Sequence, residues 1–295
     1  MPKRLSLACA ALLMLSACSS NNGDSAAPAT PAPTAASTAT AAPAATAPTL
    51  AQAGTAAAPA AAGTTASTPA AVDPSIAADR AEAAAKFVDD GSFVEGKQYQ
   101  RIEPAQPTVT NTGKIEVVEV FSYGCPACNA FHDWMDKLAA AMPKAATVVY
   151  LPASFVPQEN WPALQRVYYT AQALGVDAKG HDAMYDAVWK SGELGMMDLR
   201  SERPKPQAAW PTINDFAKFY AQYGAKPDEF VATANSFSIN TKMKRADELI
   251  KAYGVESTPT IVVNGKYRFS PKDAGSYEQT IKLTQFLVGK EAAGK

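Results

Sequence analysis

The chain has 295 residues, 27 Lys and Arg against 28 Asp and Glu, and a formal net charge of −1. Proteins that bind nucleic acids usually have an excess of basic residues, and this chain has none, so no nucleic-acid partner is expected. With 47% hydrophobic residues the chain can build a globular core, but its composition changes sharply along its length.

The N-terminus has the pattern of a secretion signal. Two basic residues precede the apolar stretch Leu5–Leu15, which is too short to span a bilayer. We expect residues 1–17 to be a signal peptide, because Leu15-Ser16-Ala17-Cys18 resembles a bacterial lipobox, in which the cysteine after the cleavage site carries lipid. Two other interpretations stay open, namely a free Cys18 after ordinary cleavage and an uncleaved anchor. A lipidated Cys18 predicts a periplasmic protein on a membrane, and Ser19 in place of Asp favours the outer membrane.

Residues 19–72 consist mostly of Ala, Pro and Thr, with Asp24 as their single charge. Such a segment cannot bury enough apolar surface to offset its chain entropy. We therefore expect residues 18–72 to be a disordered tether that begins at Cys18. Residues 73–295 then form one domain.

Hydrophobic periodicity and turn residues predict the elements of this domain. In chain order, we expect a helix at 76–88, an edge strand at 99–103, a buried strand at 115–122, a helix at 125–142, a buried strand at 147–151, helices at 161–174, 180–190, 212–223, 227–236 and 239–253, a hairpin of strands 260–263 and 266–269, and a helix at 276–288. In the helix at 125–142, the expected buried stripe is Ala130, Trp134, Leu138 and Ala141.

The order of these elements indicates the fold class. Strand–helix–strand units cross over right-handedly into parallel pairs, and Asn264-Gly265 suits a two-residue hairpin turn. Strand–helix–strand followed by strand–strand–helix is the order of the α/β thioredoxin fold. The all-helical region at about 158–254 would be an insertion between its two halves.

A pair of cysteines opens the helix at 125–142. Cys125-Pro126-Ala127-Cys128 follows a buried strand directly, and the first turn of a helix offers unpaired N–H groups that favour an anion. Cys125 should therefore ionise easily, and the thiolate is the species that exchanges disulfides. Pro126 suits the first helical position. The pattern predicts a thiol–disulfide oxidoreductase with no cofactor besides its own Cys125–Cys128 disulfide.

Three stretches, Gly96–Tyr99, Glu119–Cys128 and Thr258–Tyr267, resemble the DsbA family of periplasmic disulfide oxidases. The resemblance implies that the protein donates its disulfide to reduced secreted or outer-membrane proteins. It also implies that a quinone-linked membrane protein of the DsbB type reoxidises it. Pro259 would be cis and, with Thr258, would bind the substrate.

The resemblance also places a buried acid at Glu119, where the carboxyl group would exchange the proton of Cys128. Along the strand, Glu119 shares a face with Val117 and Phe121, which predicts burial; an edge position in solvent stays open as the alternative. Glu116 points to the other face and is given no role.

One position departs from the family. The oxidase motif is Cys-Pro-His-Cys, whereas this chain has Ala127 in place of the histidine that stabilises the neighbouring thiolate. We therefore expect a weaker oxidant than the histidine type. A disulfide reductase or isomerase, which runs the same chemistry in the other direction, remains an alternative.

Two alternatives belong to other functional classes. Cys125, Cys128 and His132 could serve a tethered metal chaperone, but they fall short of a closed zinc set, so no metal site is expected. A binding module without catalysis is the other alternative, and the intact cysteine pair argues against it. His132 and His181 are expected on helix surfaces. Five aromatic side chains are expected in the core rather than in a groove: Phe121, Tyr123, Trp134, Tyr168 and Tyr169.

Overall fold

The computed structural model describes residues 73–295. The expected signal peptide at 1–17, the lipidation site Cys18 and the tether at 18–72 lie outside the described residues. Within residues 73–295, no helix is both long and apolar enough to cross a membrane.

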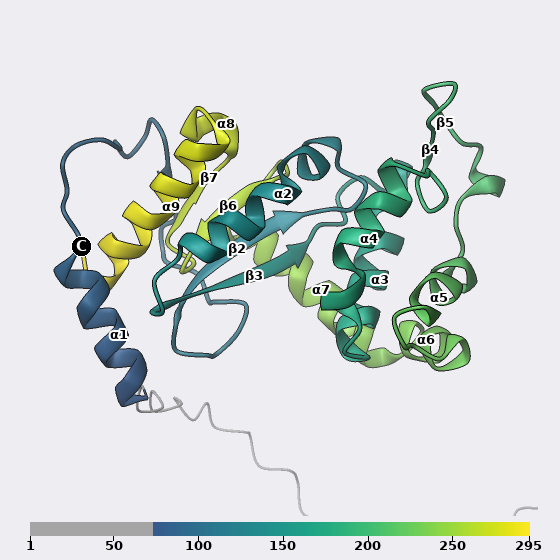
Figure 1. Cartoon of the computed structure of the whole chain (residues 1–295), viewed down its shortest axis with the longest axis horizontal. Coiled ribbons are helices and arrows are strands. Elements are labelled where there is room, and N and C mark those ends of the chain that lie inside the picture. Colours follow the sequence, from purple (N-terminus) through teal and green to yellow (C-terminus); the bar gives the residue numbers. More distant parts are fainter. Residues whose placement is uncertain (1–72) are drawn as a thin grey trace, which may run out of the picture. The chain divides into compact units, whose positions relative to one another are not determined.

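A five-stranded sheet forms the centre of the domain, with the strand order β1-β7-β6-β2-β3 (Figure 1). Its strands are β1 (Gln100–Arg101), β2 (Ile115–Phe121), β3 (Ala146–Pro152), β6 (Thr260–Val263) and β7 (Tyr267–Phe269). β2 and β3 are parallel, and the other pairs are antiparallel. Every residue of β2 is buried, as expected for a central strand covered on both faces.

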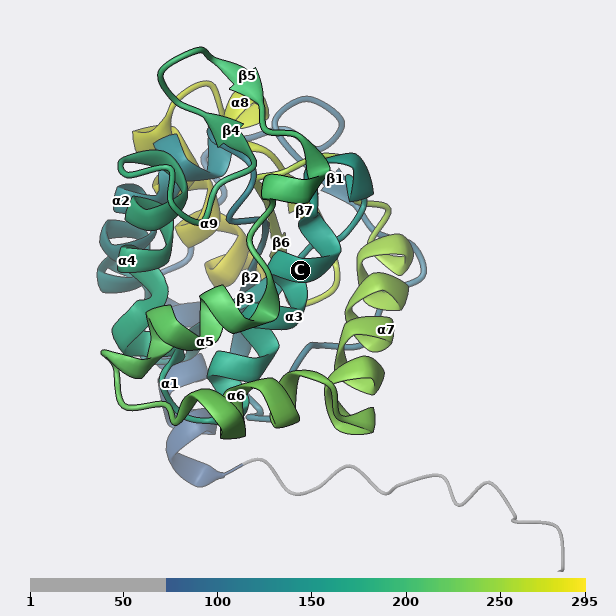
Figure 2. The ribbon, with the colours of Figure 1, turned by 90° about the vertical axis from the view of Figure 1, so that its right-hand side faces the viewer.

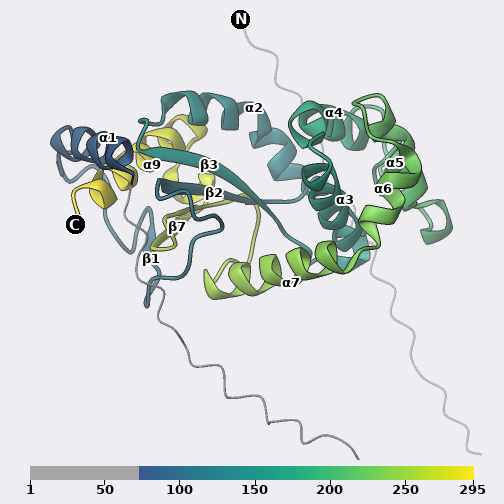
Figure 3. The ribbon, with the colours of Figure 1, turned by 90° about the horizontal axis from the view of Figure 1, so that it is seen from below.

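Helices cover both faces of this sheet, and others pack on those helices. The helices of the described residues are α1 (Pro74–Ala85), α2 (Pro126–Ala141), α3 (Trp161–Ala173), α4 (Asp177–Trp189), α5 (Ile213–Ala221), α6 (Pro227–Ala234), α7 (Phe237–Ala252), α8 (Pro271–Ala274) and α9 (Tyr277–Ala292), with short 3₁₀ turns at Pro157–Glu159 and Gln207–Ala209. Figure 3 shows α2 and α9 on one face and α7 on the other. The fold is thioredoxin-like, and helices α3–α7 are inserted between the two halves, as the element order predicted.

The buried side of α2 differs from the expected stripe. Its buried residues are Cys128, Phe131, Met135 and Leu138, so only Leu138 was predicted correctly. The spacing of three, four and three residues places Cys128 on the same stripe as the core residues. The prediction was wrong because it assigned the bulky Trp134 to the core, whereas this side chain is half-buried.

The hairpin between β6 and β7 has the predicted turn. Asn264 and Gly265 both have positive φ, 50° and 66°, as a two-residue turn that follows the strand twist requires. A second, unpredicted hairpin, β4 (Met197–Asp198) and β5 (Arg203–Pro204), projects from the helical insertion (Figure 2). Its strands have only two residues each, too few to show an alternating pattern in the sequence.

Gly265→Ala should destabilise the domain more than Gly175→Ala. Both glycines have φ near +67°, which costs a residue with a Cβ about 1 kcal/mol. A Cβ at position 175 meets nothing within 4 Å, whereas at position 265 it would lie 2.1 Å from the Gln106 carbonyl oxygen. Urea unfolding should show a loss of about 1 kcal/mol for Gly175→Ala and more than about 2 kcal/mol for Gly265→Ala. Equal losses of unfolding free energy in the two variants would contradict the close approach of the Gln106 carbonyl to position 265.

Candidate active site

The turn between β2 and α2 holds Cys125 at the start of the helix. The Cys125 N–H donates to the Ser122 carbonyl at 3.0 Å, and the Gly124 N–H donates to the Ser122 hydroxyl at 3.1 Å. Cys125 is the N-cap of α2, and Pro126 occupies the first turn. Pro126 and Ala127 are exposed, while both cysteines are buried. The sequence pattern therefore predicted the position of this turn correctly.

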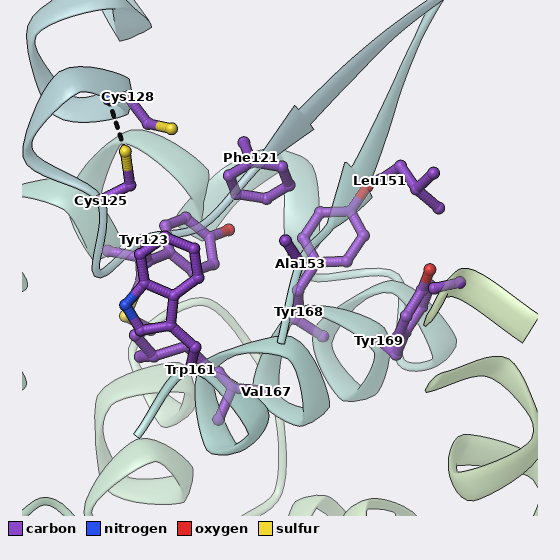
Figure 4. Close-up of a cluster of buried hydrophobic side chains, with 14 of the residues drawn as sticks. Phe121, Tyr123, Cys125, Cys128, Leu151, Ala153, Trp161, Val167, Tyr168 and Tyr169 are labelled. Carbon is purple, nitrogen blue, oxygen red and sulfur yellow. Dashed lines mark hydrogen bonds between the residues drawn. The ribbon is translucent and has the colours of Figure 1, made fainter. Parts of the chain in front are cut away.

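Cys125 receives stabilising contacts from two directions. Its Sγ accepts the Cys128 N–H at 3.2 Å (Figure 4). The Sγ also lies 3.4 Å from the Thr258 carbonyl oxygen, to which the protonated thiol can donate. The Cys128 thiol, the Thr258 side chain and the backbone N–H groups at the helix start lower the pKa of Cys125 to about 6, despite burial. Most of this thiol is therefore ionised at pH 7.

Cys128 lies one turn deeper and behaves in the opposite way. It has no solvent-exposed surface, and burial, followed by the interaction with the Cys125 sulfur, raises its pKa well above the ordinary value. Both cysteines are free thiols in the structure. The pair therefore combines an ionised thiol at the helix start with a protonated one in the core, which is the asymmetry that disulfide exchange requires.

Glu119 lies beneath this pair and is 1% exposed. Its neighbours on the adjacent strands are Tyr150 and Ile261, and its Oε1 has no hydrogen-bond partner within residues 73–295. Burial, assisted by the nearby Cys125 charge, raises the pKa of Glu119 to about 8. The predicted burial is confirmed, and the carboxyl group is suited to hold or release a proton near neutral pH.

The segment before β6 faces the cysteines from the other side. The Thr258–Pro259 bond is cis, as expected, and a second, unpredicted cis bond joins Glu103 and Pro104. A groove of about 660 Å³ runs along this segment and over Ala127. Its apolar lining includes Trp134, Pro259, Pro271 and Tyr277. The prediction of a core position was therefore wrong for Trp134, although Phe121, Tyr123, Tyr168 and Tyr169 are buried as expected.

Glu116 has a structural role that the sequence analysis missed. It is 1% exposed, and its carboxylate accepts the N–H groups of Val109 and Thr110, each at 2.7 Å, and the Thr110 hydroxyl. These bonds fix the loop that leads into β2. The sequence around Glu116 does not show that residues of the preceding loop donate hydrogen bonds to its carboxylate.

The expected surface positions of the two histidines are wrong. His181 is hydrogen-bonded through Nδ1 to the Tyr123 hydroxyl at 2.8 Å, and burial lowers its pKa to about 3. The side chain of His132 is 15% exposed and stacks on Tyr185 at 4.5 Å. Their rings meet because α2 and α4 pack together, which neither helix reveals alone. Within residues 73–295, no group of three His, Cys, Asp or Glu residues is arranged to bind a metal ion.

A thioredoxin fold with an asymmetric dithiol at a helix start, facing a cis-proline, defines the class of thioredoxin-like thiol:disulfide oxidoreductases. A family model described as thioredoxin matches residues 111–283. The thiol:disulfide interchange protein DsbA of Pseudomonas syringae is 36% identical over 198 residues, covering 67% of this chain and 84% of that protein. DsbA of Pseudomonas aeruginosa is 36% identical over 201 residues, covering 68% and 87% respectively.

The solved structures agree. The crystal structure of Pseudomonas aeruginosa DsbA has a TM-score of 0.59 and 35% identity, covering 70% of this chain and 97% of its own. Proteus mirabilis DsbA with a non-covalently bound peptide has a TM-score of 0.52 and covers 68% of this chain and 98% of its own, but at 20% identity it supports the fold alone. The chain belongs to the DsbA family and is a thiol:disulfide oxidoreductase that oxidises substrate proteins.

Replacing Glu119 by Gln should change how stability depends on pH. With a folded pKa of about 8 and an unfolded pKa of about 4.3, native Glu119 keeps a proton that the unfolded chain has released. The parent therefore loses stability as the pH rises between these values. Relative to the parent, Glu119→Gln should gain at least about 1 kcal/mol of unfolding free energy between about pH 5 and about pH 8. The free energy of unfolding, obtained from denaturant curves at several pH values, measures this difference. If it changes with pH in the same way for both proteins, the pKa of Glu119 is not raised.

Proposed function

We propose that Cys125 is the sulfur that exchanges with substrate. In the oxidised enzyme, a substrate thiolate attacks the Cys125 sulfur, the Cys125–Cys128 bond breaks, and Cys128 leaves with the electron pair. The substrate's second thiolate then attacks the mixed disulfide. This attack releases an oxidised substrate and a Cys125 thiolate, so that two electrons pass from substrate to enzyme. The observation that carries this assignment is the Cys125 sulfur accepting the Cys128 N–H at 3.2 Å, at the start of α2.

Glu119 supplies the proton that Cys128 needs in this proposal. Cys128 leaves as a thiolate in a position without solvent exposure, where a charge is costly. A neighbouring carboxyl group with a pKa of about 8 can protonate it. During reoxidation the same carboxylate takes the proton back.

Thr258 and Pro259 bind the substrate backbone in this proposal. An extended chain that pairs with the backbone of Thr258, just before β6, would place its cysteine next to Cys125, because the Thr258 carbonyl is 3.4 Å from the Cys125 sulfur. The substrates are reduced secreted or outer-membrane proteins, and a DsbB-type quinone-linked membrane protein regenerates the disulfide.

The same proposal includes a location in the periplasm. Residues 1–17 direct secretion, Cys18 carries lipid, and the segment 18–72 tethers the domain to a membrane, with the outer membrane favoured by Ser19. The lipobox-like residues before Cys18 support it. The intact mass of membrane-fraction protein should correspond to an acylated chain that begins at Cys18. A chain that begins at Cys18 without acyl mass would contradict the anchor.

Single cysteine variants should separate the two sulfur roles. Cys125→Ser should abolish oxidation of a reduced test protein, since the exchanging sulfur is gone. Cys128→Ser has no internal disulfide to donate, but its Cys125 thiolate can attack the disulfide of an oxidised substrate and release one substrate thiolate. The resulting mixed disulfide should accumulate, because Cys128 is no longer present to displace the bound substrate sulfur. Non-reducing gels and thiol titration measure both outcomes. Full activity in Cys125→Ser, or adducts in neither variant, would reject the assignment.

Ala127→His should make the enzyme a stronger oxidant. An added donor near the Cys125 thiolate stabilises the reduced form, and about 30 mV corresponds to about 1.4 kcal/mol for this couple. Equilibration with glutathione should place the parent between about −270 mV, as for thioredoxin, and about −120 mV, as for DsbA. The variant should lie a few tens of millivolts higher, with Ala127→Leu, which adds bulk but no hydrogen-bond donor, as the control. A parent potential at or below that of thioredoxin would favour the reductase alternative.

A further inference from the structure

A second pocket opens beside the active-site turn, on the side of the helical insertion. Its volume is about 290 Å³, near the lower end of the range for small-ligand sites. It can therefore hold a side chain rather than a folded element. Its lining residues come from the active-site turn, the 3₁₀ turn before α3, α3, α4 and the start of the β4–β5 hairpin: Gly124, Pro126, Glu159, Leu164, Val188, Trp189, Met196 and Met197. We refer to it below as the turn pocket.

The lining of the turn pocket is almost entirely apolar. Leu164, Val188 and Met196 are buried in it, while Trp189 and Met197 are half-buried at its edge. The Trp189 indole N–H already donates to the Tyr123 carbonyl oxygen at 2.8 Å, so this side chain offers the pocket only its apolar surface. The pocket therefore suits an aliphatic or aromatic group.

Glu159 is the single charged residue in the lining and lies at the exposed edge. Its Oε2 accepts the Trp161 indole N–H at 3.1 Å, which holds the carboxylate beside the pocket. An anionic group is thus disfavoured there.

The position of the turn pocket identifies its occupant. Gly124 and Pro126, the two neighbours of Cys125 in the chain, both line it. Any substrate that forms a disulfide with the Cys125 sulfur must approach this turn. An extended peptide advances about 3.3 Å per residue, so a side chain one or two residues from the substrate cysteine reaches the pocket. The groove along Thr258 and Pro259 has a separate lining, which includes Ala127 and shares no residue with the turn pocket.

We propose that the turn pocket is a specificity site that binds one apolar side chain of the protein substrate, such as Leu, Met or Phe, within two residues of the reacting cysteine. The proposal rests on the assignment of Cys125 as the exchanging sulfur. The enzyme thereby holds a substrate at two places near that sulfur: the backbone along Thr258–Pro259 and one side chain in the turn pocket. An unfolded segment exposes such side chains and a folded one buries them, so the pocket favours unfolded substrates.

The test uses short dithiol peptides that are identical except for Leu or Gly at one position within two residues of the first cysteine. The oxidised enzyme reacts with each peptide, and the second-order rate constant is measured. At one position, Leu should react about 10-fold faster than Gly, because transfer of a Leu side chain into an apolar site is worth that much or more. Rates that are equal for Leu and Gly at every position would overturn the proposal.

Two variants on the same hairpin provide the matched comparison. Met197→Lys places a charge at the edge of the pocket and should remove most of the preference for Leu, measured as the ratio of the Leu and Gly rate constants. Leu199→Lys changes a partly exposed residue outside the lining and should keep the preference. A preference that survives in Met197→Lys would also overturn the proposal. If no peptide is oxidised at all, the assignment of Cys125 fails instead, so the two failures are distinguishable.

Discussion

The hydrogen bond from the Cys128 N–H to the Cys125 sulfur is the contact on which the site depends. The first turn of α2 leaves this N–H without a helical partner, and the Cys125 side chain caps it. One bond thus closes the helix start and stabilises the thiolate. The same geometry directs Cys128 into the core, where burial keeps its thiol protonated. The sequence Cys-x-x-Cys at a helix start therefore creates two thiols with opposite tendencies to ionise.

The packing around the turn keeps this geometry in place. A Cβ at Gly124 would lie 2.9 Å from the Trp161 indole nitrogen and 3.1 Å from a Leu164 methyl carbon, so α3 packs directly against the turn. Trp189 of α4 fixes the Tyr123 carbonyl. The helical insertion thus supports the active-site turn in addition to enlarging the domain, and this support explains why the turn pocket lies next to Cys125.

Local patterns predicted the parts of the structure that depend on neighbouring residues. The apolar run of β2, the Asn264-Gly265 turn and the cysteine pair at the start of α2 each carry their signal within a few residues. The failures concern contacts between distant segments. Trp134 lines a groove because α2 faces the segment around Pro259, the half-buried His181 is hydrogen-bonded to Tyr123, and Glu116 accepts hydrogen bonds from a loop. Single-element periodicity contains no information about such partners, so these side chains were misplaced or left without a role.

The ionisation of Cys125 in the reduced protein tests the account most directly. The ultraviolet absorbance of its thiolate, followed against pH and compared with the Cys125→Ser variant, gives the pKa of this group. A midpoint near 6 that disappears in the variant is the expected result. A midpoint near 8.5, the value of a free cysteine at about 25 °C, would contradict the stabilisation of the thiolate by the Cys128 thiol and the helix start, and the exchange mechanism built on it.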